Sequence, residues 1–93
     1  MMLGQVIRRL EDADDEAIRS LVGDPALFAR LRTAAGAMDR PAAAYAREAI
    51  GQFLHAGTEE EWATVIGRMR DDPAPGDRLI VYAIERQLRR DGV

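Results

Sequence analysis

Apolar residues recur along the chain mainly every three or four positions, the spacing that places them on one face of an α-helix. Near the start these positions are Leu3, Val6, Ile7 and Leu10, and the spacing continues through Ala13, Ala17, Ile18 and Leu21. The pattern predicts either one helix over residues 3–22 or two helices that break at the acidic segment EDADDE, residues 11–16. In the second case Asp12 or Asp14 would cap the second helix.

Glycine, proline and aspartate divide the following part of the chain into two more helices. Gly23 suits the position after a helix, and Asp24 followed by Pro25 suits the start of the next one. The apolar face of that helix, over residues 25–38, consists of Leu27, Phe28, Leu31, Ala34, Ala35 and Met38. After Asp39-Arg40-Pro41, a further helix begins at residue 42 and ends at Gly57, with an apolar stripe of Ala42, Tyr45, Ala46, Ala49, Ile50, Phe53 and Leu54.

Two helices are predicted in the last third of the chain. Thr58 and Glu61 have the spacing of a capping box, and the helix they start has an apolar face of Trp62, Val65, Ile66 and Met69. The segment DDPAPG, residues 71–76, predicts a loop, after which Asp77 caps a helix with Leu79, Ile80, Ile84 and Leu88 on its apolar face. The expected fold is all-α, a compact bundle of five or six short helices in a single domain over residues 1–93.

Composition argues against several classes of function. The chain has 93 residues and a net charge of −3. It has no cysteine, and this excludes disulfides and cysteine-ligated metals. An acidic chain is a poor general binder of nucleic acid, because neutralisation of phosphates supplies most of that affinity. The first ten residues do not form a signal peptide, and no apolar run reaches the ~18 residues of a membrane span. We therefore expect a soluble, cytoplasmic protein without a membrane or nucleic-acid partner.

Few residues suggest catalysis or metal binding. Glu48 and His55 share a helix face and could ligate a metal, but a site needs three or four ligands and His55 is the single histidine. The acidic segment 11–16 lacks the glycine and the bidentate glutamate of a calcium loop. No nucleophile motif or phosphate-binding loop surrounds Ser20 or any other hydroxyl. We predict no catalytic residues, no cofactor and no metal, and keep a small metal or ligand binder as an alternative.

Trp62, Tyr45 and Tyr82 are the candidate interface residues, because amphipathic aromatic side chains are enriched where proteins bind one another. Trp62 leads this set, since it follows three glutamates at the start of a helix. The main functional expectation is a non-enzymatic interaction or regulatory module. Its partner would be another protein or a second copy of the chain in a homodimer.

Residues 27–54, LFARLRTAAGAMDRPAAAYAREAIGQFL, resemble the helix pair of the ribbon-helix-helix repressors. The shared features are the pair Ala34-Ala35, Arg40 in the turn, and Arg47-Glu48-Ala49-Ile50 followed by Phe53-Leu54. The resemblance implies a dimeric DNA-binding regulator or antitoxin-like protein that reads the major groove with a strand from each subunit. That strand would be AIRSLVG, residues 17–23, which lacks the polar, basic side chains that read base edges. DNA binding is therefore the alternative to the interaction module.

A second likeness concerns Glu59-Glu60-Glu61-Trp62 and the later turn Asp71-Asp72-Pro73. These segments are similar to those of small uncharacterised bacterial helical proteins, and the likeness implies no activity.

Overall fold

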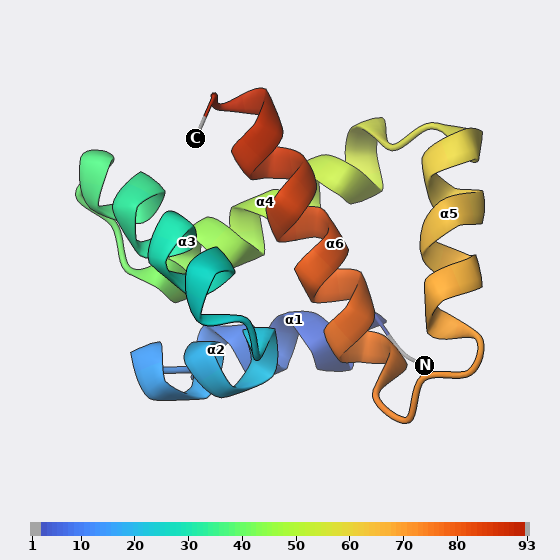
Figure 1. Ribbon diagram of the computed structural model, residues 1–93, viewed down its shortest axis with the longest axis horizontal. Helices are drawn as coiled ribbons and strands as arrows, with labels where there is room; N and C mark the ends of the chain where they lie inside the picture. The colour runs from blue at the N-terminus through green and yellow to red at the C-terminus, as the bar shows by residue number, and fades with distance from the viewer. Residues whose placement is uncertain (1–2, 93) are drawn as a thin grey trace.

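The computed structural model describes residues 3–92, which form six α-helices and no β-strand (Figure 1). The helices are α1 (Leu3–Glu11), α2 (Asp15–Val22), α3 (Pro25–Ala37), α4 (Ala42–Ala56), α5 (Glu59–Met69) and α6 (Pro75–Arg90). The radius of gyration is 12.3 Å, which agrees with the value of about 12 Å for a compact chain of this length. The prediction of an all-α compact bundle is therefore confirmed.

The acidic segment separates α1 from α2, so two helices cover residues 3–22. Asp14 caps α2, since its carboxylate accepts the backbone N–H of Ala17 at 2.8 Å. The helix ends at Gly23, whose φ of 75° is the left-handed conformation that glycine adopts without steric cost. Asp24 then caps α3 by accepting the N–H of Ala26 at 2.9 Å. Short-range polar signals thus set these boundaries as the sequence predicts.

The two helix starts in the last third of the chain differ in how well the sequence predicts them. The capping box is confirmed, because Thr58 and Glu61 each accept the other's backbone N–H at 3.1 Å. The predicted cap at Asp77 is wrong, since α6 begins at Pro75 without a side-chain cap. The fixed φ of proline suits the first helical turn, so the helix starts three residues earlier, at residue 75 rather than 78. Asp77 instead pairs with Arg9 of α1 at 3.0 Å.

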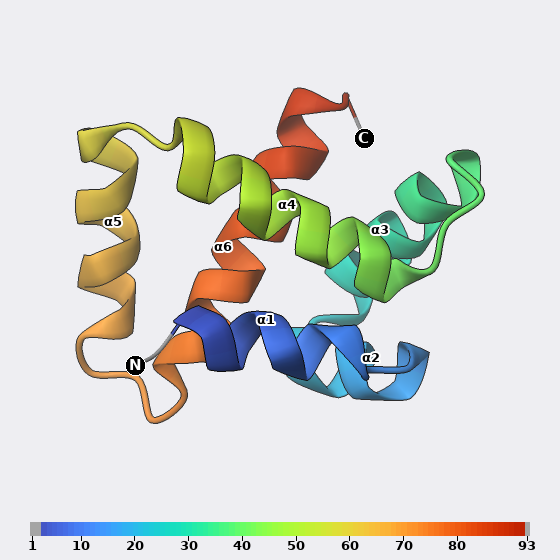
Figure 2. The same cartoon turned by 180° about the vertical axis from the view of Figure 1, so that it is seen from behind.

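Helix α6 lies at the centre of the bundle and packs against all five other helices. Its buried residues run from Leu79 to Ile84 and continue with Arg86 and Leu88. Helix α4 crosses α6 and makes the most extensive contact with it, since the small side chains of α4 allow a close approach. Seen from behind, α4 and α1 both cover α6 (Figure 2). None of the helices within residues 3–92 has the length and apolar character that crossing a membrane requires.

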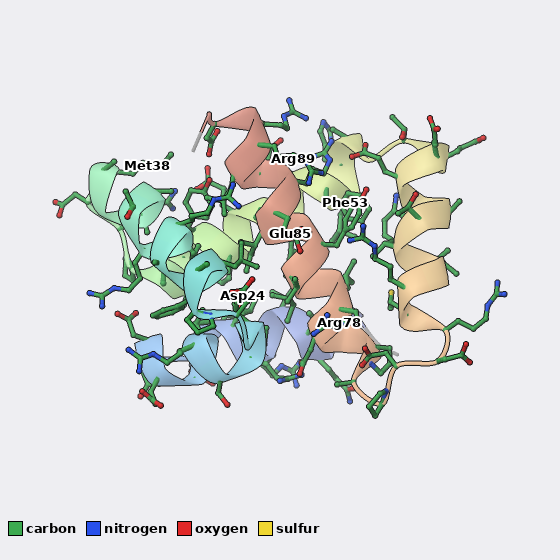
Figure 3. All side chains as sticks on the ribbon, in the orientation of Figure 1. Asp24, Met38, Phe53, Arg78, Glu85 and Arg89 are labelled. Carbon is green, nitrogen blue, oxygen red and sulfur yellow. The ribbon has the colours of Figure 1, made fainter. Side chains whose placement is uncertain are left out.

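Two large apolar residues predicted on buried faces are exposed. Met38 is 48% exposed and lies just beyond the last residue of α3, at the outer end of that helix (Figure 3). Ile66 is 51% exposed, although its spacing from Trp62 places it on the same predicted apolar face as the buried Val65 and the half-buried Trp62. The cause is that α5 packs mainly against α6, which covers one side of α5 and leaves the other side open.

Candidate protein interface

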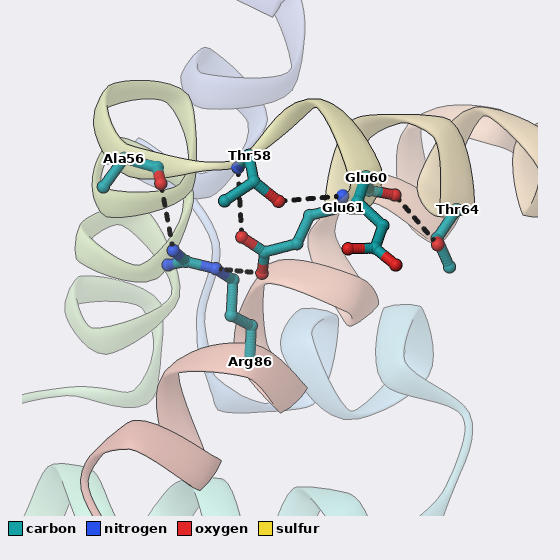
Figure 4. A network of polar contacts seen from close by, with 6 residues as sticks. All are labelled: Ala56, Thr58, Glu60, Glu61, Thr64 and Arg86. Atoms are coloured by element: carbon teal, nitrogen blue, oxygen red, sulfur yellow. Dashed lines mark hydrogen bonds and ion pairs between the residues drawn. The ribbon is translucent and has the colours of Figure 1, made fainter.

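Arg86 joins the end of α4, the start of α5 and the centre of α6. Arg86 is only 6% exposed and is the single charged residue on the buried face of α6. Nε donates to Oε2 of Glu61 at 2.6 Å, and Nη2 donates to the carbonyl of Ala56 at 3.4 Å (Figure 4). The bond from Arg86 holds the pKa of Glu61 below its ordinary value, and the bond from the backbone N–H of Thr58 lowers that pKa further.

Phe53 is the centre of an aromatic cluster beside this junction. Its side chain is fully buried, with ring centroids 4.5 Å from Trp62 and 5.4 Å from Tyr82. The guanidinium carbon of Arg86 lies 5.6 Å from the same ring. The chain leaves α4 so close to Phe53 that a Cβ on Gly57 would lie 2.6 Å from both its carbonyl oxygen and a ring carbon. Glycine is therefore required at position 57, and the cluster fixes α5 against α4 and α6.

The three predicted interface residues do not form one surface. Trp62 and Tyr82 meet through Phe53, whereas Tyr45 lies apart, where its hydroxyl donates to Oδ2 of Asp91 at 2.6 Å. Tyr45 is 2% exposed and Tyr82 is 7% exposed, and Trp62 alone of the three is half-buried. The interface role of these residues stays a prediction. Trp62 is the one of the three whose side chain a partner could reach without a change in the fold.

Replacing Tyr45 by phenylalanine is expected to lower stability by about 1 kcal/mol at neutral pH, because one hydrogen bond is lost. Burial raises the pKa of the Tyr45 hydroxyl, and the bond to Asp91 raises it further. The folded-state pKa therefore lies above the unfolded value, so this contribution is complete below about pH 10 and decreases as the pH rises above it. Urea denaturation at neutral pH and at about pH 11 measures the effect. Equal losses of stability in the wild type and in Tyr45→Phe would contradict it.

Glu48 and His55, the residues of the metal-binding alternative, are not joined to a third ligand. Glu48 forms an ion pair with Arg40 in the turn before α4, and His55 is exposed in the last turn of that helix. Across the described range 3–92, no three or more His, Cys, Asp and Glu side chains are grouped so that they could hold a metal ion. The geometry of these residues therefore adds no support for a metal site.

A groove lies between α2 and α3. It is lined mainly by apolar surface from Arg19, Ser20, Gly23, Pro25, Phe28, Ala29 and Arg32. Its volume is about 660 Å³, within the range of roughly 300–1,000 Å³ for binding pockets. Phe28 is 5% exposed and forms the floor, and the guanidinium carbon of Arg19 lies 5.4 Å from its ring centroid. The groove therefore combines an apolar floor with two arginines.

Arg32 is held in this groove by a loose contact. Its Nε lies 3.8 Å from Oδ2 of Asp15, and both side chains are more than half exposed. Exposed ion pairs of this kind contribute roughly 0–1 kcal/mol. The guanidinium of Arg32 is therefore free to exchange Asp15 for a carboxylate of a bound partner at little cost.

The apolar spacing places Phe28 in the core and does not predict the groove, because the groove depends on how α2 packs against α3. One usable signal is the placement of Arg32 four residues after Phe28, on the same helix face. Arg86 has a comparable signal, because its spacing of three and four residues from Ala83 and Tyr82 places it on the apolar face of its helix. Neither signal predicts which carboxylate pairs with the arginine, because that carboxylate belongs to another helix.

Comparison of the chain with protein-family models, with curated proteins and with solved structures finds no match. Residues 27–54, which resemble the ribbon-helix-helix pair, fall in α3 and α4. Where that family has its DNA-reading strand, residues 17–22 belong to helix α2. The resemblance to the ribbon-helix-helix repressors stays a prediction.

Proposed function

We propose that this protein is a non-enzymatic interaction module that binds a peptide segment of a partner protein in the groove between α2 and α3. The observation that carries the proposal is the groove itself, with its apolar floor at Phe28 and arginines at positions 19 and 32. The segment that fits this chemistry has a large apolar side chain with one or two carboxylates close to it.

Each part of the groove has a role in this proposal. An apolar side chain that enters the groove would lie over the floor at Phe28 and cover the exposed Pro25 and Ala29, and the removal of this surface from water would favour binding. Arg19 is already positioned over the Phe28 ring, so little side-chain entropy is lost when it binds a carboxylate. Arginine also binds carboxylates through two parallel hydrogen bonds, which fixes the orientation of the segment.

Selection from a random peptide library on the immobilised full chain tests the proposal. The enriched peptides are expected to combine a leucine or an aromatic residue with neighbouring Asp or Glu. The variant Arg19→Glu should bind them at least about tenfold more weakly, because close charge pairs at interfaces couple by about 1.5 kcal/mol or more. Arg32→Glu should act in the same direction, and dissociation constants from fluorescence anisotropy give both values.

Arg89→Glu is the matched control, since Arg89 is exposed near the end of α6 and away from the groove (Figure 3). This variant changes the net charge by the same amount as Arg19→Glu and should bind within about twofold of the wild type, as expected for a distant surface charge. If Arg19→Glu and Arg32→Glu bind the selected peptides as tightly as Arg89→Glu does, the groove is not the binding site.

A further inference from the structure

Helix α5 has two faces of different character. Its inner face packs on the bundle, with Val65 buried and with Trp62 and Met69 half-buried. Both ribbon views place the helix at the edge of the molecule, so that its other side meets no neighbouring helix (Figure 1, Figure 2). Ile66, on that side, is one of the two large apolar residues exposed in the described part of the chain.

The outer face of α5 consists of Glu59, Ala63, Ile66 and Gly67, and Arg70 continues it directly after the last residue of the helix. All five residues are exposed. Their spacing places them in one stripe along the helix. The stripe is acidic at its N-terminal end and basic at its C-terminal end, with Ile66 and two small residues between the charges. A Cβ added to Gly67 would meet no atom within 4 Å, so the space above the middle of the stripe is open.

This order of residues is complementary to itself when two copies run in opposite directions. If Ala63 of one copy faces Ile66 of the other, the same register places Glu59 opposite Arg70, because both pairs are symmetric about the same point of the helix. Each of the two contacts then occurs twice, as a twofold-symmetric interface requires. A parallel arrangement would instead place Glu59 against Glu59 and Arg70 against Arg70, which is repulsive.

We propose that the outer face of α5 binds the same face of a second copy of this chain in antiparallel orientation. Ile66 of each copy packs over Ala63 of the other, and the small residues at positions 63 and 67 allow the two helices to approach closely. Glu59 and Arg70 form ion pairs at both ends and set the direction of pairing. One helix from each copy forms an interface at the small end of the usual range, so the dimer dissociates readily on dilution.

Sedimentation of the full chain over a fiftyfold concentration range that reaches about 500 µM tests for this weak dimer. The wild type is expected to sediment as a monomer at the low end and increasingly as a dimer towards the high end. Ile66→Glu should weaken association at least about tenfold, because two charges would be buried against apolar surface. Met38→Glu, at the other exposed large apolar residue, is the matched control and should leave association unchanged.

Charge reversal tests the ion pairs. Glu59→Arg alone and Arg70→Glu alone should each weaken the dimer, because like charges then face each other at both ends. The double variant, with both changes in one chain, should associate like the wild type, since the pairs are restored with their signs exchanged. Circular dichroism on every variant checks that the helices are retained.

Introduced cysteines test the direction of pairing, because the chain has no cysteine of its own. A mixture of Glu59→Cys and Arg70→Cys chains should form a disulfide-linked heterodimer under oxidising conditions. Each variant alone should not cross-link, since positions 59 of the two copies lie about 16 Å apart along the helix axis in the antiparallel register. Self-linking of either variant, a wild type that stays monomeric throughout, or an Ile66→Glu chain that dimerises like the wild type would overturn the proposal.

The experiments can reject the dimer proposal without rejecting the peptide-binding function, and the reverse also holds. The groove residues lie on α2 and α3, whereas the dimer contact lies on α5. Arg19→Glu should therefore leave sedimentation unchanged, and Ile66→Glu should leave the affinity of a single chain for a selected peptide unchanged.

Discussion

Phe53→Ala is expected to lower the free energy of unfolding by about 3–5 kcal/mol, the range for phenylalanine truncated in a protein core. The phenylalanine is fully buried and its ring contacts Trp62, Tyr82 and the guanidinium of Arg86. Its removal leaves a cavity at the junction of three helices, and the rigid surroundings can fill that cavity only in part. Small domains are stable by only about 5–15 kcal/mol, so a large share of the stability would be lost.

Urea denaturation followed by tryptophan fluorescence measures this loss, because Trp62 is the single tryptophan and its ring contacts Phe53. Phe53→Leu keeps most of the volume and should cost about 1 kcal/mol, so it gives a measurable transition if the alanine variant does not fold. A loss below about 1 kcal/mol for Phe53→Ala would show that the aromatic cluster does not hold α5 in place.

Glu61→Gln is expected to cost about 3 kcal/mol, because it leaves the charge of Arg86 buried without a counter-charge. Removing one partner of a buried ion pair usually costs about 3–5 kcal/mol of stability. We expect the lower end of this range, because the Glu61 side chain is 26% exposed while that of Arg86 is 7% exposed. Glu60→Gln is the matched control in the same helical turn. Glu60 is exposed and its carboxylate does not bond to Arg86, so this variant should stay within about 0.5 kcal/mol of the wild type.

A second change and a pH series separate the charge effect from a packing effect. Glu61→Gln combined with Arg86→Met should be more stable than Glu61→Gln alone, because no unpaired charge remains buried. The folded-state pKa of Glu61 is lowered, so its contribution is present above the unfolded-state pKa and is lost as the pH falls through the folded-state value. Between about pH 5 and pH 3 the wild type should therefore lose more stability than Glu61→Gln. Parallel losses would contradict the ion pair.

The helices and most of their ends follow from local signals in the sequence. Asp14, Asp24 and Thr58 cap helices through bonds to backbone N–H groups two or three residues away, so a short window of sequence contains all the information. The prediction for Asp77 is wrong because two start signals compete within three residues, and Pro75 comes first.

The functional surfaces depend on tertiary packing, which the local pattern does not contain. Ile66 has the spacing of a core residue, yet it is exposed because α5 meets the bundle on one side only. Arg86 and Glu61 are 25 positions apart, and their pairing requires that α5 and α6 lie side by side. The groove likewise exists only once α2 has turned back at Gly23 against α3. Spacing identifies a helix face, and the neighbouring helices decide whether that face is buried.

The central place of α6 has a consequence for biosynthesis. The other five helices all pack against residues 75–90, which leave the ribosome after them. At about 5–20 residues per second, translation of this helix takes on the order of one to three seconds. During that interval the apolar faces of the earlier helices lack the surface that will cover them. The core can therefore close only after α6 has been made, so the fold forms as a whole and not helix by helix.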